Sequence, residues 1–183
     1  MSVLPIVTYD DDVLRKKAKP VNENSEEIQT FIEDLFETMY NSNGIGLAAP
    51  QVGTSLRIFV IDADGVMDEE EELYGKMAFI NPKIIETSDD QVSMDEGCLS
   101  IPEITDKVKR PSRIKVQFLD QNFNEKELDV DGWMSRVIQH EYDHLDGVLF
   151  IDYLSIFRKR MHKSDLEEIA AGERETKYPL VPK

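Results

Sequence analysis

The sequence QHEYDHLDGVLF, residues 139–150, contains two of the three histidines of the chain, four positions apart, with a glutamate directly after the first. Residues four apart lie on one face of an α-helix. His140 and His144 can therefore present imidazole nitrogens to one divalent ion, while Glu141 points at whatever the ion holds. This H-E-x-x-H arrangement is typical of hydrolytic metal sites.

The flanking residues indicate a buried helix rather than a solvated surface helix that carries His and Glu by chance. Asp131 is a suitable N-cap for a helix that begins at about Gly132, and Gly147 can take the left-handed conformation that ends one. Trp133 and Val137 lead along the same face into the histidine pair. An apolar face that continues into the pair indicates that the helix carries its ligands into a core.

A catalytic metal site needs a third protein ligand, with a fourth position open for water. The metzincin peptidases use a histidine six residues after the second, but Phe150 occupies that position here. The only cysteine, Cys98, lies in a glycine-flanked turn of VSMDEGCLSIP, residues 92–102, and thiolate is a preferred ligand of zinc and similar ions. The alternative third ligand is a downstream glutamate, Glu167 or Glu168, as in another H-E-x-x-H metallopeptidase.

A second unusual stretch is GIGLAAPQVG, residues 44–53, which has three glycines, a proline and no charge. Such a loop can bring its backbone very close to a ligand. It is not a phosphate-binding loop, because the lysine of that motif and its strand–loop–helix context are both absent. Gln51 is its only polar side chain, and the alternative is an ordinary apolar loop with a solvated glutamine.

The rest of the pattern predicts helices near both ends and short strands between them. Residues 1–20 are expected to form an extended arm on the body, and Asn24 or Ser25 to cap a helix with the apolar stripe Ile28, Phe31, Ile32, Leu35, Phe36 and Met39. Strands are expected at 57–62, 77–81 and 84–87, with a hairpin at 113–120 and 125–130. A last amphipathic helix is marked by Ile151, Leu154, Phe157 and Met161, and a loose tail follows at 172–183.

This order of elements predicts an α+β fold, with small antiparallel β-sheets packed around a central metal-binding helix, an N-terminal helix and a C-terminal helix. No repeat or linker divides the chain, so residues 1–183 are expected to form a single catalytic domain, with the C-terminal helix and tail at 153–183. The acidic segment DADGVMDEEEEL, residues 62–73, is expected to be a mobile, solvated surface insertion. Its carboxylates do not match the spacing of an EF-hand loop.

Composition limits the possible partners. A formal net charge of -16 argues against a general affinity for phosphate backbones, so no specific DNA binding is expected. No apolar run approaches the ~20 residues of a membrane span, and the first residues do not resemble a signal peptide. A single cysteine excludes an internal disulfide framework. The protein is therefore expected to work in the cytoplasm, without contact with a membrane.

Three stretches together, GIGLAAPQVG (44–53), EGCLSIP (96–102) and QHEYDHLDG (139–147), resemble the signature motifs of the peptide deformylases in order and spacing. The similarity runs from the N-terminal arm to about Asp152. The segment at 62–73 is longer than the family leads us to expect, and the C-terminal region varies within the family. Neither the segment at 62–73 nor the C-terminal region contains a motif residue. These differences therefore concern the partners of the protein and not its reaction.

The resemblance implies a hydrolase that removes the formyl group from N-formylmethionyl peptides and nascent chains and releases formate. It implies Cys98, His140 and His144 as metal ligands, Glu141 as general acid and base, the Gln51 amide and the Leu99 backbone N–H as the oxyanion hole, and Ile45, Gly46, Trp133 and Val137 as the pocket for a methionine side chain. The family works with Fe²⁺ and tolerates Ni²⁺, Co²⁺ or Zn²⁺, so Fe²⁺ is the expected ion.

The family can also use its C-terminal region to dock on the ribosome. The net negative charge opposes this, and the basic cluster Arg158, Lys159, Arg160 and Lys163 is the one surface that can reverse the repulsion locally. The alternative is an ordinary solvated helix face.

Two other functions compete with this interpretation. A metallopeptidase with Glu167 or Glu168 as its third ligand leaves Cys98 and the glycine-rich loop unexplained. A metal-buffering module without catalysis leaves Glu141 and Gln51 without a task.

Overall fold

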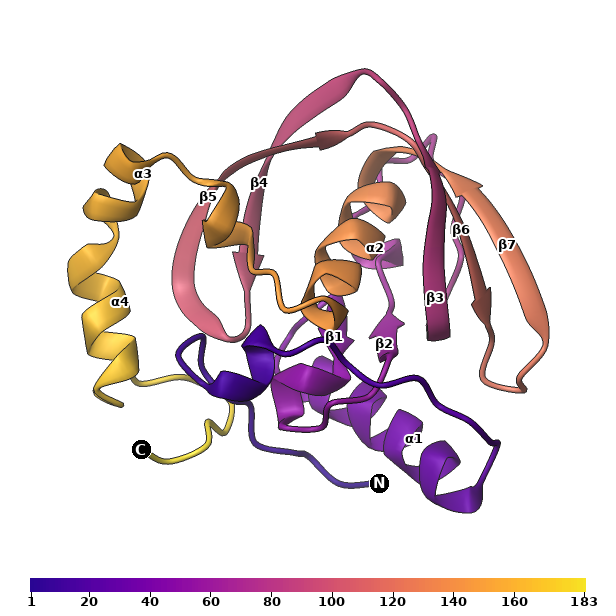
Figure 1. The fold of residues 1–183 in the computed structure, drawn as a ribbon, viewed down its shortest axis with the longest axis horizontal. Coiled ribbons are helices and arrows are strands. Elements are labelled where there is room, and N and C mark those ends of the chain that lie inside the picture. The colour runs from indigo at the N-terminus through magenta and orange to yellow at the C-terminus, as the bar shows by residue number, and fades with distance from the viewer.

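The computed structural model describes residues 1–183 as a mixture of α-helices and antiparallel sheets, which confirms the expected α+β class (Figure 1). A five-stranded antiparallel sheet has the order β1 (Gly46–Ala48), β2 (Ile58–Ile61), β3 (Met77–Thr87), β6 (Ile114–Leu119) and β7 (Glu125–Val130). A second sheet pairs β4 (Gln91–Cys98) with β5 (Ile101–Pro111). The helices are α1 (Glu26–Asn41), α2 (Gly132–Leu145), α3 (Ile156–Met161) and α4 (Lys163–Ala170). None of these helices has the length and apolar character that crossing a membrane requires.

Strand β2 is buried on both faces because a helix covers each side of the sheet. Ile58 and Val60 belong to a core cluster with α1, whereas Phe59 and Ile61 belong to a cluster with α2. Successive side chains of a strand point to opposite faces, which explains this division. Full burial of each such side chain stabilises the fold by about 1.5–3 kcal/mol, so this strand fixes both helices against the sheet.

Helix α1 forms as the sequence predicts. Ser25 Oγ accepts a hydrogen bond from Ile28 N at 3.2 Å, and two glutamates occupy the first turn, where the helix dipole favours negative charge. Four residues of the predicted stripe, Ile32, Leu35, Phe36 and Met39, are buried against β2 and its neighbours, while Ile28 and Phe31 are partly buried.

Helix α2 lies between the two sheets, with the β4–β5 pair on one side and the five-stranded sheet on the other (Figure 1). It ends as expected, with Asp146 at the C-cap and Gly147 at φ 75°. A Cβ at Gly147 would lie 2.7 Å from the backbone oxygen of Arg15, so the N-terminal arm can approach only a glycine here. Asp131 occupies the N-cap position, but its side chain makes no capping hydrogen bond, and that part of the prediction is wrong.

The two strands expected at 77–81 and 84–87 are one strand, β3, interrupted by an irregularity in its pairing with β6. Asn81 adopts φ 49°, a conformation that asparagine tolerates better than most residues. Its side chain accepts from Val21 N and donates to Val21 O, both at 2.8 Å. Asn81 therefore does not end the strand, and its side chain binds the strand to the N-terminal arm.

Strand β5 was not predicted from the sequence, although its exposed and buried residues alternate regularly. Its inward positions include Asp106 and Arg110, which are buried together with Ile104 and Val108. Charged residues at inward positions hide the hydrophobic alternation by which a strand is recognised.

The C-terminal region differs from the expectation in three respects. Ile151 lies in a 3₁₀ turn, and the expected single helix is two helices, α3 and α4, separated at His162. Phe157 and Met161 do not face the body, since they are 71% and 58% exposed, whereas Leu154 is buried. The tail is not loose, because Leu180 forms a parallel bridge with Ile6 of the N-terminal arm.

We predict that Asn81→Ala lowers the free energy of unfolding by about 2 kcal/mol, because two side-chain hydrogen bonds to the backbone are lost at a left-handed position. Chemical denaturation measures this change. Asn22→Ala, which alters an exposed asparagine in the adjacent arm, is the control and should leave stability within about 0.5 kcal/mol of the parent. Equal stability of the two variants would contradict the role of Asn81.

Candidate functional site

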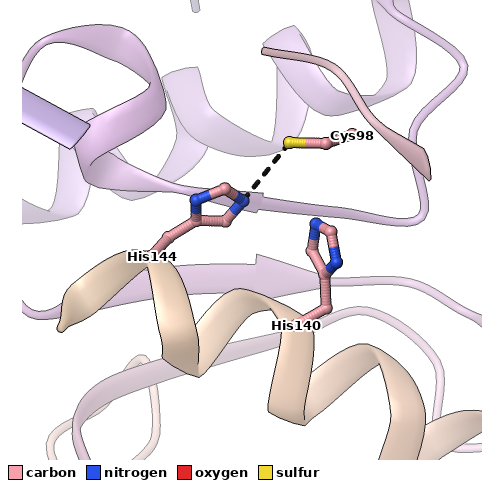
Figure 2. A group of neighbouring side chains, drawn as sticks. All are labelled: Cys98, His140 and His144. Atoms are coloured by element: carbon pink, nitrogen blue, oxygen red, sulfur yellow. Dashed lines mark hydrogen bonds between the residues drawn. The ribbon is translucent and has the colours of Figure 1, made fainter. Parts of the chain in front are cut away.

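Three potential metal ligands converge where the end of β4 meets α2. The ligand atoms of Cys98, His140 and His144 all lie within 4.8 Å of one another. Figure 2 shows the sulfur of Cys98 above the two imidazole rings, which project from successive turns of the helix. Helical spacing brings the histidines together, and the last residue of β4 supplies the cysteine.

The distance between Cys98 and His144 is close to that of two neighbouring ligands of a tetrahedral ion. Bonds of about 2.0 Å to nitrogen and 2.3 Å to sulfur place neighbouring ligand atoms about 3.4–3.6 Å apart. Cys98 Sγ lies 3.4 Å from His144 Nε2. Burial lowers the pKa of His144 well below its usual value, which keeps the imidazole in the neutral form that binds metals. One thiolate and two imidazoles are a suitable donor set for zinc, iron or nickel.

Glu96 fixes the orientation of His140. Its Oε1 lies 2.8 Å from His140 Nδ1, which turns Nε2 of the same ring towards the cysteine and leaves that atom free to bind an ion. Metal-binding histidines commonly donate their other N–H to a carboxylate, which sets the tautomer and the ring orientation. Glu96 and Cys98 both lie near the end of β4, where the pairing with β5 is irregular between Gly97 and Cys98.

Two arginines neutralise the buried Glu96 carboxylate. Arg110 donates from Nε to Oε2 at 2.6 Å and from Nη2 to Oε1 at 2.9 Å, and Arg136 Nη1 donates to Oε2 at 2.7 Å. Burial alone would raise the pKa of Glu96, but the hydrogen bonds from Arg110 and His140 hold it well below its usual range. Glu96 is therefore an anion at neutral pH and a hydrogen-bond acceptor for His140.

Glu141 is buried beside the histidines, and burial raises its pKa to about 7. Its Oε2 has no hydrogen-bond partner within the protein. A Cβ at Gly46 would lie 2.6 Å from Glu141 Oε1, so the carboxylate has its place only because β1 carries a glycine there. A carboxyl group with this pKa can both accept and return a proton near neutrality.

Gln51 lies in a 3₁₀ turn, residues 49–52, with its amide held in one orientation. Its Oε1 accepts from Ala48 N at 2.9 Å, which directs Nε2 towards Cys98 Sγ at 3.4 Å and Ser100 Oγ at 3.3 Å. Leu99 follows the cysteine directly, and its side chain packs close to Gly44, where a Cβ would lie 2.9 Å from Leu99 Cδ1. The glycine-rich loop therefore packs against the cysteine turn.

A cavity of about 450 Å³ opens in front of these residues. All four expected pocket residues, Ile45, Gly46, Trp133 and Val137, line it together with Gln51, Cys98, Leu99, His140 and Glu141. Strand β1 and the residues before it form one wall, and α2 forms another. The structure thus brings all of the expected site residues to a single concave surface, apart from His144, which lies behind it.

The alternative third ligands are not at this site. Glu167 and Glu168 lie on α4, at the periphery of the molecule (Figure 1). Glu167 forms an ion pair with Lys163, and Glu168 forms one with Arg174. Neither belongs to the cluster of Cys98 and the histidines. This excludes the metallopeptidase arrangement.

Four residues that support this site, Glu96, Arg110, Arg136 and Tyr178, are not among those expected from the sequence. Glu96 belongs to the motif EGCLSIP, but no local pattern marks its carboxylate as the partner of His140, because the two residues are 44 positions apart. Tyr178 lines the cavity and donates to the Leu99 carbonyl oxygen at 2.8 Å. No local pattern indicates Tyr178, because only the pairing of the tail with the N-terminal arm brings it there.

Comparison with known proteins gives consistent results. A sequence model of the family described as Polypeptide deformylase matches residues 3–160. The peptide deformylase of Salinibacter ruber is 52% identical over 186 residues, which cover 99% of this chain and 95% of that protein. The peptide deformylase of Cytophaga hutchinsonii is 44% identical over 178 residues, covering 97% and 96% of the two chains.

Solved structures of peptide deformylases are also similar to this chain in fold. The crystal structure of peptide deformylase from Ehrlichia chaffeensis superimposes with a TM-score of 0.85 at 42% identity, covering 94% of this chain and 98% of that one. Its complex with actinonin gives a TM-score of 0.86 at 41% identity, covering 96% and 100%.

We predict that Glu96→Gln lowers metal affinity by about 10- to 100-fold. The neutral amide replaces the anionic carboxylate that accepts the hydrogen bond from His140 Nδ1. Competition with a chelator measures the affinity. Glu125→Gln, which changes an exposed glutamate on β7, should bind the ion as tightly as the parent. Unchanged affinity in Glu96→Gln would show that this carboxylate does not support the ligand.

Proposed function

The chain belongs to the polypeptide deformylase family, and on this premise we propose which of its residues perform the reaction. It is a hydrolase that removes the N-formyl group from newly made polypeptides, and its family is metal-dependent. This membership also removes the alternative of a metal-buffering module. One observation carries the assignment of roles: Cys98, His140 and His144 converge, and two of them, Cys98 and His140, line one cavity together with Glu141.

Cys98, His140 and His144 would hold the metal ion. The 4.8 Å limit on the separation of their ligand atoms and the anchoring of His140 by Glu96 support this ligand set. A divalent ion held there acts as a Lewis acid and lowers the pKa of a water molecule from 15.7 towards about 7.

Glu141 is the general base and then the general acid. It accepts a proton from the water whose oxygen adds to the formyl carbon, and it returns a proton to the amine nitrogen as the C–N bond breaks. The products are formate and a peptide with a free N-terminus. Its burial and its unpaired Oε2 support this role.

The Gln51 amide and the Leu99 backbone N–H stabilise the negative charge that develops on the formyl oxygen. The hydrogen bond from Ala48 N to Gln51 Oε1 supports this role, because it leaves the N–H groups of the amide as the donors on the side of the site. One such donor stabilises a transition state by about 3 kcal/mol.

The methionine side chain of the substrate lies against Ile45, Gly46, Trp133 and Val137. Their position around the cavity supports this placement, since an apolar wall next to the reacting group suits an unbranched thioether. We further propose that residues 1–183 act as a single catalytic domain, with 153–183 as its C-terminal part, and that the enzyme works in the cytoplasm, where its substrates are made.

We predict that Glu141→Gln keeps its metal content but loses at least about 10²-fold in kcat, because an amide cannot transfer the proton. Formate release from a formyl-Met peptide measures kcat. Gly46→Ala should give a similar pattern, because the added methyl group displaces the same carboxylate. Retained activity in Glu141→Gln would exclude this residue as the general base.

Fe²⁺ is the proposed physiological ion, with Zn²⁺, Ni²⁺ or Co²⁺ as possible substitutes, since the donor set accepts all of them. We predict that protein purified without oxygen contains mainly iron and loses activity in air, and that reconstitution with Ni²⁺ or Co²⁺ gives an enzyme that survives air. Elemental analysis and formate release measure both properties. Full, air-stable activity with zinc as the only bound ion would contradict the proposal.

Ribosome contact through the C-terminal region is the remaining proposal. Arg158 is not available for it, because its guanidinium binds the buried Asp106 and holds α3 to β5. Lys159, Arg160 and Lys163 remain exposed, next to the exposed apolar side chains Ile156, Phe157 and Met161. A basic surface with apolar side chains suits an interface with ribosomal RNA and protein.

We predict that changing Lys159, Arg160 and Lys163 to glutamine abolishes co-sedimentation with ribosomes, with turnover of a short formyl-Met peptide unchanged. Binding of the parent should weaken as salt rises. The control variant changes the exposed Lys16, Lys17 and Lys177 to glutamine, which alters net charge equally. Loss of binding in both variants, or in neither, would dispose of the proposal.

A further inference from the structure

The acidic segment at 62–73 is held in place by its own carboxylates. Asp64 closes its base, because the two carboxylate oxygens accept from Tyr74 N and Gly75 N, each at 2.9 Å. Glu71 Oε2 accepts from Asp68 N at 2.8 Å, which fixes the turn that carries Glu71. Much of the segment is exposed to solvent, as its composition predicts, but these hydrogen bonds give its base and its turn a defined conformation.

The second oxygen of Glu71 binds the start of the metal-binding helix. Glu71 Oε1 accepts from Trp133 N at 3.0 Å, across 62 positions of sequence. The first N–H groups of a helix have no partner within it, and a negative charge is favourable at this end. Since Asp131 makes no side-chain cap, Glu71 supplies the capping hydrogen bond that a neighbouring residue usually provides.

Gly132 makes this contact possible. It is the first residue of α2, it adopts φ 55°, and a Cβ there would overlap Glu71 Oε1. The neighbouring acids Glu69 and Glu70 are exposed and accept no hydrogen bond. Of these neighbouring glutamates, only Glu71 contacts the start of α2. A general electrostatic effect of the acidic segment on the helix would not select one residue.

The capped turn carries Trp133, the residue at the outer end of the cavity-lining face of α2. We propose that Glu71 is a positioning residue that fixes the first turn of α2 and, through it, the Trp133 wall of the methionine pocket. The inference rests on the proposed role of Trp133 in that pocket. It gives the acidic segment a task in substrate binding, separate from metal binding at the other end of the helix.

The test compares Glu71→Ala with two matched variants. Glu71→Gln keeps one oxygen acceptor for Trp133 N but loses the second, which accepts from Asp68 N. Glu70→Ala removes the same charge from the same segment without removing a hydrogen bond. Glu71→Ala should raise KM for a formyl-Met peptide by about three- to tenfold, the range expected for loss of one capping hydrogen bond. Its kcat should stay within about twofold of the parent, with equal metal content, because the histidines and Glu141 lie further along the helix.

Trp133 is the only tryptophan, so its fluorescence reports this turn directly. Glu71→Ala should lower the fluorescence anisotropy and shift the emission, because an uncapped first turn moves more freely. Glu70→Ala should match the parent in fluorescence and in KM, and Glu71→Gln should lie between the parent and Glu71→Ala in both. An unchanged KM in Glu71→Ala, or an equal rise in Glu70→Ala, overturns the inference.

Trp133→Ala separates failure of the inference from failure of the pocket assignment. A raised KM in Trp133→Ala without a rise in Glu71→Ala overturns only the role of Glu71. An unchanged KM in Trp133→Ala overturns the pocket assignment and the inference with it. If Glu71 acts through Trp133, the double variant Glu71→Ala/Trp133→Ala has the KM of Trp133→Ala alone, whereas additive effects contradict the proposal.

Discussion

The buried carboxylate of Glu96 is the interaction on which the site depends. It joins β4, Arg110 of β5, and Arg136 and His140 of α2 in one network. Removing one partner from a buried ion pair costs about 3–5 kcal/mol, so these elements hold one arrangement. The same end of β4 carries Cys98, so the network that orients His140 also joins the helix of the two imidazoles to the strand that carries the thiolate.

Close backbone approach is the second constraint. Gly46 leaves room for the Glu141 carboxylate, and Gly44 leaves room for Leu99, so the glycine-rich loop packs against both the helix and the cysteine turn. A methyl group at either position would occupy space that these side chains use. The loop therefore brings the Gln51 amide to the ligands without any side chain between them. These two glycines therefore make room for protein side chains.

Local spacing made the centre of the site predictable from sequence. Residues four apart on a helix gave His140 and His144, and a lone cysteine was paired correctly with them in space. Features that depend on tertiary pairing were not predictable. Strand β5 has no recognisable hydrophobic alternation, because two of its inward-facing residues, Asp106 and Arg110, are charged. Phe157 and Met161 have the spacing of a buried helix face, but they are exposed. The cap on α2 comes from Glu71, too far along the chain for any local rule.

If one thiolate and two imidazoles hold a single catalytic ion, the metal content of the protein must depend on Cys98 and not on the glutamates of α4. Elemental analysis of the purified protein and of its Cys98→Ala, Glu167→Ala and Glu168→Ala variants measures this. We expect one ion per chain in the parent and in both glutamate variants, and loss of most of the metal in Cys98→Ala. Full metal occupancy in Cys98→Ala would show that the thiolate is not a ligand.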